Sequence, residues 1–210
     1  MIRKYQRIGL IVVSIALLPA VIFAARPILR KLFGPKPQCV SGNCINGNGR
    51  MIFQSGGSYT GSFKNEKPDG TGFWSGANGD KYTGEWKGGD KHGYGRYTYV
   101  DGTEYNGQFE HNIKQGTGTF TWGDGTQYRG PWHAGTMEGN GTLSLPDGRA
   151  LRGTYQAGRI HDGTGIFKYK DGSTFTGEWK NGKRHGKGIL TDESGKILKA
   201  GHWENDEFKE

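Results

Sequence analysis

The stretch YTGEWKGGDKHGYGRYTYVDGTE, from Tyr82 to Glu104, contains a pattern that recurs along most of the chain. Tyr opens it, Gly follows two places later and Trp four places later, and a polar loop, a Gly-x-Gly pair, alternating bulky residues and Asp-Gly complete it. Equivalent repeats open 23 residues apart at Tyr59, Tyr82, Tyr105, Tyr128 and Leu151, and then 24 apart at Phe175 and Lys199. Self-similarity at a fixed period indicates a repeat array.

The alternation of residue types within a repeat predicts two short strands, because successive side chains of a strand point to opposite faces. In the first strand, one face carries Tyr82, Gly84 and Trp86. In the second strand, one face carries Gly93, Gly95, Tyr97 and Tyr99. Glycine weakens a strand unless something packs closely on its backbone. We therefore expect rings to lie over the glycines and define one face of the sheet, called here the aromatic face.

Turn residues stand where one repeat passes to the next, at Asn78-Gly79, Asp101-Gly102, Asp124-Gly125, Asp147-Gly148 and Asp171-Gly172. These dipeptides favour the positive φ of tight hairpin turns. The predicted fold is all-β: an elongated, single-layer antiparallel β-hairpin array over residues 46–203. Each end carries a half-repeat, with a second strand over 47–53 and a first strand over 199–203 that lacks its partner. Residues 204–210 are expected to be an acidic C-terminal tail.

Composition separates the two ends of the chain. Only 32% of the 210 residues are hydrophobic and 39 are glycine, but the 26 aromatic residues recur periodically, which disordered segments do not show. The net charge of +8 comes from residues 1–36, which hold seven Lys and Arg and no acid, whereas residues 37–210 hold 21 bases and 20 acids. Nucleic-acid binding needs basic residues clustered on the binding face, so no nucleic-acid partner is expected.

The N-terminal segment is predicted to be a membrane anchor. A basic tail at 1–7 precedes residues 8–25, which carry no charge and as a helix would span about 27 Å. A cleaved signal peptide is the alternative, but Phe23 and Ile22 disturb the small-residue cleavage pattern. The basic residues are divided too evenly between the two flanks for the positive-inside rule to decide the orientation of the segment in the membrane. We expect a single-pass protein with an exported array; the alternative is a cytosolic array whose basic flank lies on anionic headgroups.

Residues 26–45 combine a basic juxtamembrane segment, a proline linker and the only two cysteines, Cys39 and Cys44. The Ser-Gly-Asn between them would allow a turn that brings the two sulfurs together. An exported array favours a disulfide here, and a cytosolic one favours free thiols. A metal site would need two further ligands, which the neighbouring sequence does not supply. No metal and no cofactor is predicted.

The repeats resemble the membrane occupation and recognition nexus (MORN) repeat, whose pattern is close to Tyr-x-Gly-x-Trp, a polar loop, Gly-x-Gly and Asp-Gly. The resemblance covers about 46–203, with departures at Pro131, Leu151 and Asp192 that put local strand regularity in doubt. It implies a β-hairpin array that acts as a scaffold or interaction surface, and in some members contacts phospholipids. Aromatic–glycine hairpins of cell-wall-binding modules are a less similar alternative, because those carry adjacent aromatic residues.

Catalytic motifs are not found in the sequence. His92, His161 and His185 fall at about one repeat position, so turn chemistry explains them better than a shared metal ion. Glu85 and Glu178 recur identically and are expected to be solvated strand residues opposite the aromatic face. Neither a nucleophile elbow, a phosphate-binding loop nor a zinc-binding helix motif is present. The protein is predicted not to be an enzyme.

Two binding functions are predicted. In the first, an unknown protein partner binds the aromatic face, because Tyr and Trp are favoured interface anchors. Its predicted residues are Tyr59, Phe63, Tyr82, Trp86, Tyr97, Tyr99, Tyr105, Phe109, Trp122, Tyr128, Trp132 and Trp179. In the alternative, anionic phospholipid binds loop bases, namely Lys87, Lys91, Lys180, Lys183, Arg184 and Lys187. In both, the membrane is contacted through residues 8–25.

Overall fold

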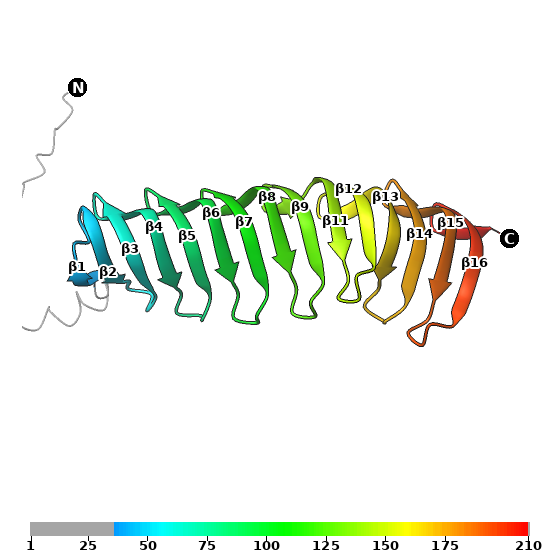
Figure 1. Ribbon diagram of the computed structural model, residues 1–210, viewed down its shortest axis with the longest axis horizontal. Coiled ribbons are helices and arrows are strands. Elements are labelled where there is room, and N and C mark those ends of the chain that lie inside the picture. The colour runs from blue at the N-terminus through cyan, green and yellow to red at the C-terminus, as the bar shows by residue number, and fades with distance from the viewer. Residues whose placement is uncertain (1–35, 210) are drawn as a thin grey trace, which may run out of the picture. The chain divides into compact units, whose positions relative to one another are not determined.

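The computed structural model describes residues 36–209, and within this range every regular element is a strand. The strands form one 17-stranded antiparallel sheet and follow one another in chain order (Figure 1). This confirms the all-β prediction. Within residues 36–209 we find no helix with the length and apolar character needed to cross a membrane. The basic tail at 1–7 and the anchor predicted at 8–25 lie outside the described residues.

Most repeats contribute two strands. Their bounds are β1 (Gln38–Gly42), β2 (Gly47–Ile52), β3 (Ser58–Lys64), β4 (Lys67–Ser75), β5 (Lys81–Lys87), β6 (Asp90–Thr98), β7 (Glu104–Glu110), β8 (Ile113–Thr121), β9 (Gln127–His133), β10 (Thr136–Met137), β11 (Gly139–Ser144), β12 (Ala150–Gln156), β13 (Arg159–Lys168), β14 (Thr174–Lys180), β15 (Lys183–Thr191), β16 (Ile197–Glu204) and β17 (Glu207–Lys209). In the repeat that contains Pro131, the two-residue β10 and the longer β11 both pair with β9.

A regular repeat aligns its glycines across the sheet. In the β5–β6 hairpin, Tyr82 faces Tyr97 and Gly84 faces Gly95, and the register shifts at a bulge before Trp86. The next pairing continues the rows, since Gly95 faces Gly107 in β7. Neighbouring strands therefore place glycine beside glycine on the aromatic face, next to a large ring.

The opening tyrosine lies across these glycines, as the sequence predicts. A Cβ atom added to Gly95 would be 2.3 Å from the Tyr82 hydroxyl oxygen and 2.4 Å from its ring carbon Cε2. The Tyr82 side chain has no exposed surface, and its hydroxyl donates a hydrogen bond to the Glu85 carbonyl at 3.0 Å. The hydroxyls of the other opening tyrosines donate to carbonyls at the equivalent position; these pairs are Tyr59–Ser62, Tyr105–Gln108 and Tyr128–Pro131.

Edge-to-face rings of successive hairpins form the hydrophobic core. Tyr82 contacts Trp86 of its own strand at a centroid distance of 5.2 Å and Phe109 of the next repeat at 5.1 Å, with interplanar angles of 85° for both. Such pairs contribute about 0.5–1.5 kcal/mol each beyond their burial. We call this set the ring stack; its members are Tyr59, Phe63, Tyr82, Trp86, Tyr105, Phe109, Tyr128, Trp132, Tyr155, Phe175, Trp179 and Trp203.

The short turns have the conformation that the Asp-Gly pairs predict. Gly102 has φ of +83° and Gly125 has φ of +84°, in the left-handed region that glycine adopts without strain. The Asp101 carboxylate accepts a hydrogen bond from the Thr103 N–H at 2.9 Å, and Asp124 does the same for Thr126. Each short turn therefore satisfies its own backbone donors.

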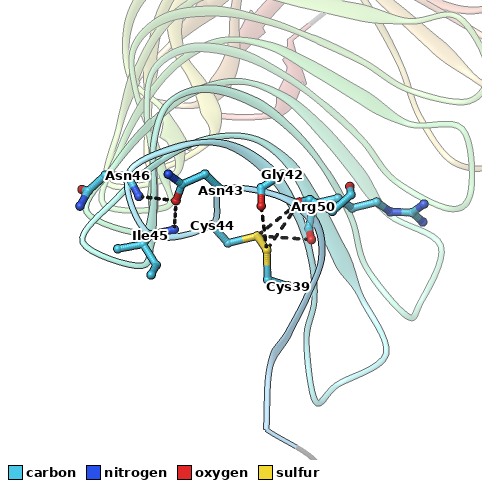
Figure 2. Close-up of a disulfide and its surroundings, with 8 residues drawn as sticks. Cys39, Gly42, Asn43, Cys44, Ile45, Asn46 and Arg50 are labelled. Carbon is cyan, nitrogen blue, oxygen red and sulfur yellow. Dashed lines mark hydrogen bonds between the residues drawn. A yellow bond between two sulfur atoms is a disulfide. The ribbon is translucent and has the colours of Figure 1, made fainter.

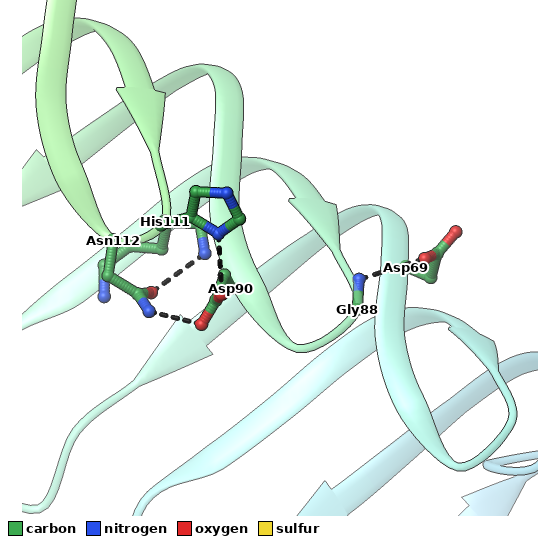
Figure 3. Close-up of polar contacts among 6 residues, drawn as sticks. Asp69, Gly88, Asp90, His111 and Asn112 are labelled. Carbon is green, nitrogen blue, oxygen red and sulfur yellow. Dashed lines mark hydrogen bonds and ion pairs between the residues drawn. The ribbon is translucent and has the colours of Figure 1, made fainter.

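Hydrogen bonds join successive longer turns, which lie at the ends of the strands opposite the short turns (Figure 3). The Asp69 carboxylate accepts a hydrogen bond from the Gly88 N–H at 3.0 Å, one repeat further on. In the next turn, the Asp90 carboxylate contacts His111 Nδ1 at 3.3 Å and accepts a hydrogen bond from the Asn112 side-chain amide. Each repeat thus positions the turn of the next.

The array extends beyond the predicted limits 46–203 at both ends. Strand β1 pairs with β2, with Cys39 opposite Met51, and so lies within the segment 26–45 expected to be a linker. Strand β17 pairs with β16, with Phe208 opposite Trp203. The prediction that the strand ending near Trp203 has no partner is therefore wrong, and part of the expected tail 204–210 belongs to the sheet.

A disulfide joins Cys39 and Cys44, whose Cα atoms are 5.9 Å apart (Figure 2). The Asn43 side-chain oxygen accepts hydrogen bonds from the N–H groups of Ile45 and Asn46, each at 3.0 Å, which fixes the turn between the cysteines. Cys44 is buried and belongs to the core cluster. The disulfide therefore ties the first strand to the end of the core, and because its loop is short it removes little chain entropy.

One repeat departs from the regular register. In the β12–β13 hairpin, Leu151 faces Gly165 and Gly153 faces Gly163, whereas the equivalent glycine in a regular hairpin faces the later member of the Gly-x-Gly pair. Strand β13 nevertheless pairs with β14 in the usual way, with Gly165 opposite Gly177. Strands β12 and β13 are thus displaced by two residues relative to each other, whereas β11 and β12 keep the regular register, with Gly141 opposite Gly153. The local irregularity expected from Leu151 and the extra loop residue is confirmed.

Candidate functional site

A second row of large side chains lies beside the ring stack on the aromatic face. We call it the outer row; its rings are Trp74, Tyr97, Tyr99, Phe120, Trp122, Phe167 and Tyr169. All are half-buried, in contrast to the ring stack. Tyr97 and Tyr99 have ring centroids 4.6 Å apart, and those of Phe120 and Trp122 are 4.7 Å apart. The outer row is the part of the aromatic face that remains in contact with solvent.

The twelve residues predicted to bind a partner divide between the two rows. The nine in the ring stack, each with an exposed fraction of 9% or less, are Tyr59, Phe63, Tyr82, Trp86, Tyr105, Phe109, Tyr128, Trp132 and Trp179. In this conformation they build the core and present little surface. The three in the outer row are Tyr97, Tyr99 and Trp122. Partner binding stays a prediction. Of the twelve residues, those of the outer row expose more surface to a partner than those of the ring stack.

Two lysines fill the space between the rows. Lys91 Nζ lies 5.3 Å from the centroid of Trp74 and 5.4 Å from that of Tyr97. Lys114 Nζ lies 4.3 Å from the centroid of Phe120 and 5.0 Å from that of Trp132. A cation over ring faces is attracted by their quadrupoles. Burial nevertheless lowers the pKa of Lys91, opposed by Asp90 and Asp80, and lowers the pKa of Lys114 to about 8.

One carboxylate anchors the outer row. Asp80 is buried and accepts hydrogen bonds from the Tyr97 hydroxyl at 2.7 Å, the Asn78 amide at 2.8 Å and the Val100 N–H at 2.9 Å. The bond from Tyr97 is the main reason that the pKa of Asp80 is lowered, since donors to a carboxylate favour its charged form. Asp80 thereby fixes the orientation of the Tyr97 ring.

The six residues predicted to bind phospholipid do not form one set. Lys91 lies among the rings, and Arg184 pairs with Asp206 at 3.2 Å and lies 4.4 Å from the Trp203 centroid. The four that are exposed are Lys87, Lys180, Lys183 and Lys187. Anionic phospholipid binding stays a prediction, with fewer free bases than the sequence suggested.

Several polar roles were missed at the sequence level. The Glu85 carboxylate accepts a hydrogen bond from the Tyr94 N–H at 3.0 Å, and Glu178 does so from the Lys187 N–H at 3.2 Å. These glutamates are exposed as expected, but they also satisfy the backbone donor left free by the bulge. The periodic recurrence of Glu, Gln and Glu at 85, 108 and 178 was the available signal, because Gln108 binds Thr117 in the same way.

The histidines lie at or next to a repeat position whose side chain, in other repeats, accepts a hydrogen bond from a backbone N–H of the following long turn. Gln115 accepts from the Ala134 N–H, Glu138 from Ala157 and Asp162 from Asn181. His92 and His185 occupy the equivalent position, while His161 precedes Asp162 and contacts its carboxylate at 2.6 Å. Within residues 36–209, no group of three or more His, Cys, Asp or Glu side chains is arranged to hold a metal ion.

The fold and this face define a class of protein, a single-sheet β-hairpin repeat protein whose core is a stack of rings. The chain belongs to the MORN repeat family: the model of the MORN repeat matches residues 59–81, 82–104, 105–127, 128–148 and 175–197, which is more than half of the chain. The stretch between the last two matches contains the irregular β12–β13 hairpin.

Two solved structures show a weak likeness to the chain. The TCP domain of Drosophila melanogaster SAS-4, in complex with a proline-rich motif of Ana2, is 13% identical, with a TM-score of 0.44 and coverage of 94% of this chain and 96% of that chain. The TCP10 domain of Danio rerio CPAP is 16% identical, with a TM-score of 0.37 and coverage of 74% and 79%. No curated protein sequence matches the chain. These likenesses are too weak to bear on function.

Lys114 gives a test of the environment between the two rows. Its folded pKa of about 8 lies below the usual value of about 10.4. Between these values the unfolded chain binds the proton that the folded chain has lost, so this group makes folding more favourable as pH rises from about 8 towards about 10. The Lys114→Met variant has no such group. Urea unfolding should show the wild-type midpoint rising relative to that of the variant over this range, and a constant difference would contradict the buried position.

Proposed function

We propose that the protein is a non-catalytic scaffold that binds a partner protein through the outer row of its aromatic face. The observation that supports this most strongly is the half-buried outer row, in which Tyr97, Tyr99, Phe120 and Trp122 remain in contact with solvent beside a fully formed core. Large exposed apolar surfaces on soluble domains commonly mark interaction sites. Aromatic side chains held rigidly by their neighbours suit the role of anchors, because little side-chain entropy is lost on binding.

We also propose that residues 8–25 anchor the protein in a membrane and that the array lies on the exported side. The disulfide between Cys39 and Cys44 supports the exported side, since such bonds persist in oxidising compartments.

Thiol labelling of intact cells tests this localisation. With a membrane-impermeant maleimide, the exposed Cys39 should react only after an impermeant reductant has been added, because the oxidised pair has no thiol. The Cys39→Ser/Cys44→Ser variant is the control for labelling of other proteins. Labelling that requires lysis of the cells would place the array on the cytosolic side.

Photo-crosslinking tests partner binding. We would replace Tyr99 or Trp122 by benzoylphenylalanine in the full chain, and use Tyr94 as the matched control, because it is 58% exposed and lies on the opposite face. We expect irradiation of cells to give a discrete protein adduct from the two outer-row positions and not from Tyr94. Equal adducts from both faces, or adducts with lipid alone, would argue against the proposal.

A further inference from the structure

The aromatic face is hollowed over the irregular repeat and the repeat before it. The cavity there has a volume of about 1140 Å³, slightly more than the roughly 300–1,000 Å³ of small-molecule sites. Its apolar lining includes Met137, Leu143, Leu145, Leu151, Tyr155 and Ile160. In the two regular repeats that precede it, Lys91 and Lys114 occupy the space between the ring stack and the outer row, so the position of the cavity needs a physical cause.

One row of residues crosses the sheet opposite the second ring of each first strand. Lys91 faces Trp86 and Lys114 faces Phe109, and both lysines reach in among the rings. In the next two repeats the same row has Met137 opposite Trp132 and Ile160 opposite Tyr155. The two lysines are thus replaced by uncharged side chains where the cavity lies.

The outer row and the register change at the same place. Leu143 occupies the position of Tyr97 and Phe120, and Leu145 that of Tyr99 and Trp122, so two rings are replaced by smaller side chains. Leu151 takes the position of the opening tyrosine, because it lies opposite Leu143 as Tyr105 lies opposite Tyr97. On its other side, the altered register places Leu151 opposite Gly165. Three ring positions and two lysine positions therefore change together, and the space that they leave is the cavity.

The polar groups of the cavity are mostly basic. Arg159, Lys168 and Lys170 line it, are exposed, and make no ion pair or side-chain hydrogen bond within residues 36–209. Arg184 also lines it but is paired with Asp206, which leaves Asp124 as the only other lining carboxylate. The lining thus carries four bases and two acids, and a bound group that supplies negative charge would be favoured.

One buried donor in the lining has no partner. The indole Nε1–H groups of Trp86 and Trp132 donate to the carbonyls of Gly72 and Gly118, at 3.4 and 3.3 Å. Trp179 lines the cavity, is 9% exposed, and its Nε1–H is unpaired within the described residues. Gly165, at the position equivalent to Gly72, has φ of +136° and belongs to the irregular repeat. An unpaired buried donor costs about 1–3 kcal/mol, so the altered register has a local energetic cost at the wall of the cavity.

We infer that this cavity is the docking site for an acidic, aliphatic segment of the partner protein: two or more aliphatic side chains enter it, and a neighbouring Asp or Glu meets Arg159 and Lys170. The inference rests on the proposed function and assigns it a place and a chemistry. The lining strands run from β10 and β11, which both pair with β9, to β15. From β11 to β15 there are four strand spacings, about 19 Å, which is the length of roughly six extended residues. Lys91 and Lys114 exclude the segment from the neighbouring repeats.

Selection from a display library of random peptides on the immobilised full chain tests the inference. We expect enriched peptides to combine aliphatic residues with Asp or Glu. Met137→Lys places in the cavity the residue that Lys91 and Lys114 supply elsewhere, and Leu143→Tyr fills it without charge, as Tyr97 does in a regular repeat. Both variants should weaken binding of the selected peptides at least about tenfold, while the exposed neighbouring change Thr136→Lys leaves it unchanged.

Charge reversal tests the basic border separately. Arg159→Glu with Lys170→Glu should weaken binding by about tenfold or more, whereas Lys64→Glu with Lys187→Glu, which changes the net charge equally at exposed sites outside the cavity, should not. Urea unfolding of each variant shows that the array remains folded. Because lysine and tyrosine already occupy the equivalent positions of regular repeats, Met137→Lys and Leu143→Tyr are compatible with the fold.

The results separate this inference from the proposed function. Enriched peptides that lack acidic residues, or that bind Met137→Lys as well as wild type, would overturn the assigned site; so would the absence of any enrichment. In each case a protein adduct from benzoylphenylalanine at Tyr99, which lies outside the cavity lining, would still support the scaffold. Tighter, Met137→Lys-sensitive binding of phosphatidylserine vesicles than of any selected peptide would identify a lipid as the occupant and overturn the inference.

Discussion

The close approach of one tyrosine ring to two backbone glycines is the constraint on which the rest of the structure depends. A single-layer sheet has no second layer to cover it, so its apolar side chains must bury one another. Tyr82 achieves this by lying across Gly84 and Gly95, where a Cβ atom would overlap the ring. The ring then contacts Trp86 of its own strand and Phe109 of the next first strand, and the hydroxyl donates a hydrogen bond to a carbonyl of its own strand. The many glycines of the chain are therefore part of the core.

This way of building a core leaves functional surface on the same face. Because the ring stack needs only the first strand and the glycines, the ends of the second strands can carry side chains that are not required for burial. In the regular repeats these are outer-row rings closed by Lys91 and Lys114. Where the register changes at β12, smaller side chains take both places and a cavity opens. The same departure from the repeat pattern that weakens the ring stack locally thus creates the site proposed for the partner.

The sequence was sufficient for the regular parts of the fold, because each of its signals has a local cause. The alternation of Tyr, Gly and Trp assigned the aromatic face, and the Asp-Gly pairs located the short turns. It was insufficient where burial is decided by neighbouring repeats. Tyr82 and Tyr97 carry similar rings on the same face, but only the contacts across strands show that the first is fully buried and the second half-buried. The two-residue displacement between β12 and β13 and the resulting cavity likewise depend on pairing that no single repeat encodes. Strands β1 and β17 were missed because they lack the repeat pattern.

The stability of two glycine variants tests the central claim most directly. Gly95→Ala should lower the free energy of unfolding in urea by at least about 2 kcal/mol, because the Tyr82 ring cannot keep its place over an added methyl group. Gly102→Asn is the matched control, since Gly102 lies in a turn with no atom within 4 Å of an added Cβ and has φ of +83°, which Asn tolerates. It should cost less than about 1 kcal/mol. Equal costs at the two positions would contradict the account, because the glycines of the strands would then have no special part in the core.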